Sequence, residues 1–121
     1  MENFRQKLSF KKEMKYVLLI LFFSSPVYSQ KIFSVNYDYQ ADLKVFVTDY
    51  DYQADLKVYK VNYDYQANKD GLLYFTNYDY QAEFKIYFVK YDYQADLKIF
   101  YVNYDYQTGW NNKHKQYILK F

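Results

Sequence analysis

The sequence of 121 residues contains no cysteine, one proline, two glycines and one histidine. Without cysteine the chain has neither disulfide bonds nor thiolate metal sites. Two glycines are too few for the glycine-rich loops that bind calcium in some β-repeat proteins. The histidine, His114, lies in a lysine-rich tail, and few serines or threonines follow residue 29 to act as a nucleophile beside it. We therefore expect a protein that is not an enzyme and holds no metal or cofactor.

Positive charge is concentrated near the N-terminus. The chain has a net charge of +2, but residues 1–29 contain five Lys or Arg and two Glu, which leaves residues 30–121 with a net charge of −1. Arginine occurs only at Arg5. Because phosphate binding needs clustered positive charge, we expect no nucleic-acid partner.

The N-terminal segment has the layout of a secretory signal peptide. A basic stretch at residues 8–15 precedes the apolar block YVLLILFF, and Pro26 ends that block. Val27-Tyr28-Ser29 then places small or aliphatic residues where a signal peptidase reads them, so we expect cleavage after Ser29. A start at Met14 in place of Met1 gives a shorter leader of the same kind.

The apolar block is too short to anchor the chain in a membrane, because spanning hydrocarbon takes roughly 20 apolar residues. We therefore expect residues 1–29 to be a helical signal peptide and residues 30–121 to be one mature domain. The mature protein is expected to be secreted or periplasmic, with no stable membrane anchor after cleavage.

Everything after the leader is repetitive. The motif YDYQ occurs six times, beginning at Tyr37, Tyr50, Tyr63, Tyr78, Tyr91 and Tyr104. The spacings are 13, 13, 15, 13 and 13 residues, and the unit reads close to NYDYQADLKVYxV. Self-similarity at a fixed period indicates a repeat architecture.

Each unit predicts a strand and a turn. From residue 41 the sequence ADLKVFV alternates, with apolar residues on one face and Asp42, Lys44 and Phe46 on the other, as in a β-strand. Asp and Lys on one face can pair opposite charges between neighbouring strands. The Asn-Tyr-Asp segment before each strand is typical of a turn. The fold class is therefore all-β, built from six strand-turn units of about 13 residues.

The third unit is two residues longer and contains Asp70-Gly71, a tight-turn signal. Three YDYQ copies precede it and three follow it, and the sixth unit also ends in a glycine-containing segment, TGWNNK. This arrangement predicts two related halves, with a chain that runs out, turns at its midpoint and winds back along itself.

The repeated YDYQADLKVY unit, the central KDGLLYF variant and the closing YQTGW resemble the septoil-knot family of small bacterial domains. The resemblance covers the chain from about residue 31 to the end. It implies a compact all-β domain whose backbone forms a torus knot with seven crossings. It implies no activity, and no catalytic or binding residues to transfer.

Four aromatic residues outside the YDYQ motif are candidates for a ligand surface: Tyr59, Tyr87, Phe100 and Trp110. Tyr59, Tyr87 and Phe100 fall on the Asp/Lys face of their strands, where they form either a flat aromatic platform or part of a core buried on both faces. The expected function is that of an exported, non-enzymatic structural or interaction domain. The alternative is a carbohydrate- or ligand-binding module that uses these aromatics. The sequence does not identify the partner, for which an envelope or extracellular protein or glycan is the expectation, and we expect a monomer.

Overall fold

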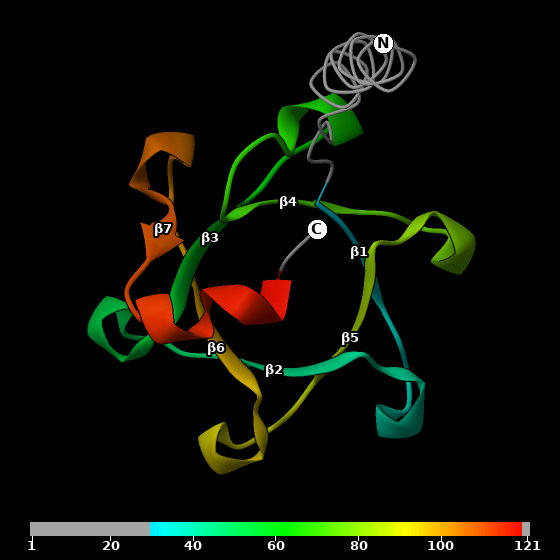
Figure 1. Ribbon diagram of the computed structural model, residues 1–121, viewed down its shortest axis with the longest axis horizontal. Coiled ribbons are helices and arrows are strands. Elements are labelled where there is room, and N and C mark those ends of the chain that lie inside the picture. Colours follow the sequence, from blue (N-terminus) through cyan, green and yellow to red (C-terminus); the bar gives the residue numbers. More distant parts are fainter. Residues whose placement is uncertain (1–29, 120–121) are drawn as a thin grey trace, which may run out of the picture.

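A computed structural model of the protein describes residues 30–119 (Figure 1). The predicted signal peptide and its cleavage point lie outside the described residues. The strands are β1 (Lys31–Ser34), β2 (Leu43–Val47), β3 (Leu56–Lys60), β4 (Leu72–Phe75), β5 (Phe84–Phe88), β6 (Leu97–Tyr101) and β7 (Gly109–Trp110). The 3-10 turns are η1 (Asp38–Gln40), η2 (Asp51–Gln53), η3 (Asp64–Gln66), η4 (Asp79–Gln81), η5 (Asp92–Gln94), η6 (Asp105–Gln107) and η7 (Lys113–Leu119).

Strands β1 to β6 close into a parallel β-barrel. Their order is β4-β1-β5-β2-β6-β3, and a further pairing of β3 with β4 closes the ring. Figure 1 looks down this ring and shows turns η1 to η6 projecting outward from it. The short strand β7 adds to β3 in the antiparallel direction. The predicted all-β fold with repeated strand-turn units is therefore confirmed.

Alternation along each strand decides what lies inside the barrel. In β2, Leu43 and Val45 are buried while Lys44 is exposed, as a pleated strand requires. The buried residues that share the core are Ile32, Leu43, Val45, Leu56, Val58, Leu73, Ile86, Leu97 and Ile99. Most are β-branched or leucine, which fill a small barrel well. The predicted alternation is thus confirmed for Leu43 and Val45, whereas Val47, at the end of the strand, is exposed.

The two halves of the chain interleave. The first half supplies β1, β2 and β3, and each of the six ring pairings joins one of these strands to β4, β5 or β6 of the second half. Connections of ordinary length step over one strand: β1 to β2 passes β5, and β2 to β3 passes β6. Three such steps in a ring of six would bring the chain back to β1.

The longer third unit prevents that collision. It advances the chain by one position only, from β3 to the adjacent β4, so that β4 fills the place between β3 and β1. Strands β5 and β6 then fill the remaining gaps. The second half therefore follows the first around the barrel in the same direction, with every pairing among β1 to β6 parallel. The chain does turn at its midpoint, as expected. Its second half then runs in the same direction as the first, so the expectation that it winds back is wrong.

The strands are staggered around the ring. Ile32 pairs with Phe84, and Ile86, two residues further along β5, pairs with Leu43. Such a stagger accompanies the strand tilt that closes a barrel. An aspartate extends the ladder where a strand begins: Asp42 donates its backbone N–H to the carbonyl of Lys85, and its Oδ2 accepts the N–H of Lys85 at 2.9 Å.

Asp55 with Lys98 and Asp96 with Lys44 make the same reciprocal contacts. These aspartates therefore bind strand backbone, and the predicted Asp–Lys pairing across neighbouring strands is wrong. The ion pairs of residues 30–119 lie elsewhere, at Lys31–Asp64 and Lys115–Asp55.

The two ends of the barrel differ. The segment η7 lies across the end where the strands begin, and its Ile118 packs against the core. Lys115 secures η7 there through Asp55, at 3.1 Å. At the end where strands finish, the Lys60 ammonium lies 4.8 Å from the ring centre of Phe75 and 5.0 Å from that of Tyr101. This cation–π contact covers the aromatic end of the core.

Replacing Gly71 with Ala should destabilise the protein by about 2–4 kcal/mol. Gly71 has a φ of 90°, and a Cβ there would lie 2.6 Å from the Lys57 carbonyl oxygen and 2.8 Å from Thr108 Cβ. Gly109→Ala is the matched control, because a Cβ there meets nothing within 4 Å. It should lose only the backbone contribution, about 1–2 kcal/mol. Equal losses in urea denaturation would contradict this account of the midpoint.

Refolding of residues 30–121 should take seconds or longer, because five of the six ring pairings join residues 43 or 52 positions apart and such long-range closure is slow. Stopped-flow refolding measures this directly. The segment contains no proline and no cysteine, so neither proline isomerisation nor disulfide exchange can cause a slow phase. Complete refolding within milliseconds would refute the expectation.

Candidate functional site: the tyrosine corners and their grooves

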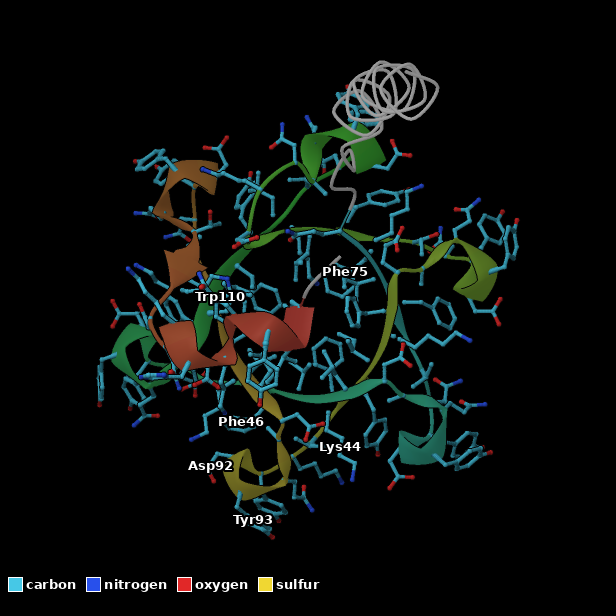
Figure 2. The ribbon with its side chains drawn as sticks, viewed as in Figure 1. Lys44, Phe46, Phe75, Asp92, Tyr93 and Trp110 are labelled. Carbon is cyan, nitrogen blue, oxygen red and sulfur yellow. The ribbon has the colours of Figure 1, made fainter. Side chains whose placement is uncertain are left out.

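The four aromatic residues singled out in the sequence are all half-buried. Trp110 packs against the core, and its indole N–H donates to Asp70 Oδ2 at 3.1 Å. It thereby ties β7 to the midpoint turn. Figure 2 shows Trp110 beside the ring of strands, on the side that carries β7 and η7. Tyr59, Tyr87 and Phe100 alternate with the inward residues Val58, Ile86 and Ile99, so their rings stand on the outer wall.

All twelve tyrosines of the YDYQ motifs are exposed, although the sequence analysis had assigned these motifs only to bends. In each unit the first tyrosine is 55–58% exposed and the second 69–79%. Figure 2 shows Tyr93, a second tyrosine, at the outer tip of its corner. The sequence did contain a signal for this exposure. Tyr-x-Tyr recurs in the turn, outside the alternating strand, where no neighbouring strand is expected to cover the side chains.

Each YDYQ motif folds into the same 3-10 corner. In the first, the Gln40 N–H donates to the Tyr37 carbonyl and the Ala41 N–H to the Asp38 carbonyl, both at 3.1 Å. The remaining corners repeat both bonds. The corner thus satisfies its own backbone, and the two tyrosine rings come together on its outside with centroids 5.4–5.7 Å apart. That separation is typical of favourable aromatic pairs.

The residue two positions before the first tyrosine of a corner determines the angle between the two tyrosine rings. In two units it is threonine, and Thr48 Oγ1 donates to Gln53 Oε1 at 3.2 Å while accepting the N–H of Tyr50. In the third unit it is Val61, and Gln66 Oε1 accepts the N–H of Tyr63 directly. The rings are inclined by 36° in the threonine units and by 9–14° in the others. The glutamine oxygen thus accepts either from the threonine hydroxyl or directly from the backbone.

Three grooves of the same design lie between the outer wall and the corners, with volumes of about 400, 420 and 390 Å³. An outward aromatic residue from a strand forms the wall of each: Tyr59, Phe100 and Tyr87 respectively. The corner that follows this strand adds its second tyrosine and its glutamine. These are Tyr65 with Gln66, Tyr106 with Gln107, and Tyr93 with Gln94.

Charged groups of both signs complete each groove. The first aspartate of a different corner reaches in from across the sheet, as Asp105, Asp51 and Asp38 respectively. At least one lysine accompanies it: Lys60, Lys57, or Lys44 with Lys90. The structure therefore brings together three of the four predicted aromatics, one in each groove, with polar groups that sequence reasoning had not connected to them.

Little else in residues 30–119 has the character of a reactive site. No group of three or more Asp, Glu or His side chains lies close enough there to hold a metal ion. Burial raises the pKa of Tyr101 above its usual value of 10.0, which places a neutral phenol at the Lys60-covered end of the barrel. In the same part of the chain, no helix is long and apolar enough to cross a membrane.

Thr48→Val should convert the second corner to the geometry of the valine units. Gln53 Oε1 is then free to accept the Tyr50 N–H, so every polar group keeps a partner and the unfolding free energy should change by less than about 1 kcal/mol. The inclination between Tyr50 and Tyr52 should fall from 36° into the 9–14° range of the valine units. A crystal structure and urea denaturation test both statements, with Val61→Thr as the reverse change. A loss of several kcal/mol would show that the threonine is indispensable.

Comparison with known proteins gives one match. No curated protein and no solved structure matches the chain significantly. The model of the 7(1) septoil knot domain family matches residues 29–111, which include β1 to β7 and all six corners. On this match the chain belongs to the septoil knot domain family.

Proposed function

We propose that the protein is a non-enzymatic interaction domain that contacts its partner through the tyrosine corners. The observation that carries the proposal is the repeated exposure of paired tyrosines on six outward corners of one barrel. Tyrosine supplies a large contact area with a polar tip and loses little conformational entropy on binding. A closed barrel keeps the bases of the corners fixed, so the surface is organised before the partner arrives.

The placement of the carboxylates supports a role without catalysis. Apart from Asp49 and Asp70, the aspartates of residues 30–119 recur in equivalent positions, either first in a corner or where a strand begins. Acid–base catalysis usually needs two carboxylates in unlike environments. Repetition gives these groups like environments, and the strand-capping aspartates are already engaged by backbone N–H groups.

Export is part of the proposal. The basic and apolar layout of residues 1–29 supports a cleaved signal peptide, and hence a secreted or periplasmic domain without a membrane anchor. The tyrosine-rich surface would then face an envelope or extracellular protein or glycan. Closure of the barrel supports a monomer, because the ring leaves β1 to β6 without the unpaired edges through which sheets associate.

We also propose that the backbone is knotted, as the family description states. Interleaving supports this: η1 lies against β5, η5 against β2 and η6 against β3, so connections of each half cross outside strands of the other. True knots are very rare in proteins, and a path that circles the barrel more than once with alternating strands is what a torus knot needs.

Replacing the second tyrosine of all six corners with serine should abolish partner binding while leaving the barrel folded, because these side chains are 69–79% exposed. Purified wild type and variant are incubated with the envelope fraction of the producing cell, and the retained protein is measured. At least a tenfold loss is expected. Circular dichroism and thermal unfolding control for folding. Equal retention would refute the role of the corners.

A further inference from the structure

We propose that the three grooves are equivalent subsites for a neutral polysaccharide. The inference rests on the proposed function, and it names the chemical class of the partner. Each groove combines a wall aromatic, a corner tyrosine, a glutamine and an aspartate from the same positions of the repeat, together with at least one lysine whose position differs between grooves. The three grooves are built alike because the repeat places the same residue types at the same positions of the barrel.

The shape and the aromatic residues fit a sugar ring. The volumes of about 390 to 420 Å³ lie at the small end of the range for small-molecule sites. The half-buried wall aromatic offers one π face, and the exposed corner tyrosine offers a second ring with a hydroxyl at its tip. Aromatic faces pack on the apolar C–H face of a sugar, while hydroxyl, amide and carboxylate groups bind its rim.

The polar groups have free hydrogen-bonding capacity. Gln66 and Gln107 use Oε1 to accept backbone N–H groups, and within residues 30–119 their Nε2 atoms donate to no other group. The side chain of Asp51, at the mouth of the Phe100 groove, likewise makes no bond within these residues. Each groove therefore offers amide donors beside a carboxylate acceptor. The two hydroxyl groups of a vicinal diol can hydrogen-bond to both.

Charge selects a neutral ligand. An aspartate and at least one lysine line every groove, so an anionic or cationic ligand would gain from one and be repelled by the other. Uncharged hydroxyls can instead bond to both. The Tyr87 groove has a second lysine, Lys90. Lys90, Lys44 and Asp38 are all exposed, so solvent screens the three charges alike.

Repetition selects a polymer over a small sugar. Shallow and open subsites bind a single residue weakly, but several equivalent subsites on one rigid body can engage the recurring units of a glycan. Linked binding of this kind raises affinity by about 10²–10⁴ without any new contact. The grooves lie on the β5/β2, β6/β3 and β3/β4 surfaces, so they face different directions and can hold separate strands of a glycan network.

The test uses native electrophoresis of the mature protein in gels that contain dextran, xylan, mannan or galactan, with polygalacturonate as the anionic comparison. At least one neutral polymer should retard the protein, and polygalacturonate should retard it less. The groove variant replaces Tyr65, Tyr93 and Tyr106 with serine. The control variant replaces Tyr39, Tyr52 and Tyr80, which are equally exposed but line none of the three grooves.

The groove variant should lose at least tenfold in affinity for the retarding polymer, and the control variant less than twofold. Equal losses in both would show that stacked tyrosines bind wherever they occur, which overturns the groove assignment and leaves the interaction domain intact. Failure of all four neutral polymers, or tighter binding of polygalacturonate, overturns the inference. The proposed function is judged separately by envelope retention of the six-tyrosine variant, so the two failures are distinguishable.

Discussion

Parallel pairing between the two halves of the chain is the constraint on which the rest of this structure depends. None of β1, β2 and β3 pairs with another of the three, and each is completed by strands of the second half. The core residues belong to both halves, so neither half can bury its apolar face alone. The stagger of the strands, the position of the two-residue insertion and the outward placement of the corners all follow from fitting a second circuit between the strands of the first.

Repetition made some features of this fold readable from the sequence and concealed others. Alternation in residues 43–47 identified Leu43 and Val45 as inward, and Asp70-Gly71 marked the midpoint turn. Strand neighbours were not readable, because the units are nearly identical: Val45 beside Leu97 and Val45 beside Leu56 present the same side chains. Only the geometry of closing a ring of six decides between them. The longer third unit carries that decision, since it alone changes the step from two positions to one.

The candidate site was predicted in part. Alternation placed Tyr59, Tyr87 and Phe100 on the outer faces of their strands, where they now form groove walls. The corner tyrosines were missed because the YDYQ motif was assigned only to a bend, whereas a 3-10 turn with satisfied backbone bonds turns both rings outward. The aspartates opposite them, such as Asp105 beside Tyr59, come from a corner more than 40 positions away. No local pattern could have brought them together before the strand order was known.

The interleaved order also governs what the chain can do while it emerges from a ribosome or a membrane pore. Residues 31–60 appear first and find no partner strand, because β1 is completed by β4 and β5, and β2 by β5 and β6. The first partner, β4, is complete only at Phe75, and the ring cannot close until β6 has emerged at Tyr101. A polypeptide of this design is thus kept open by its own topology until its second half is present.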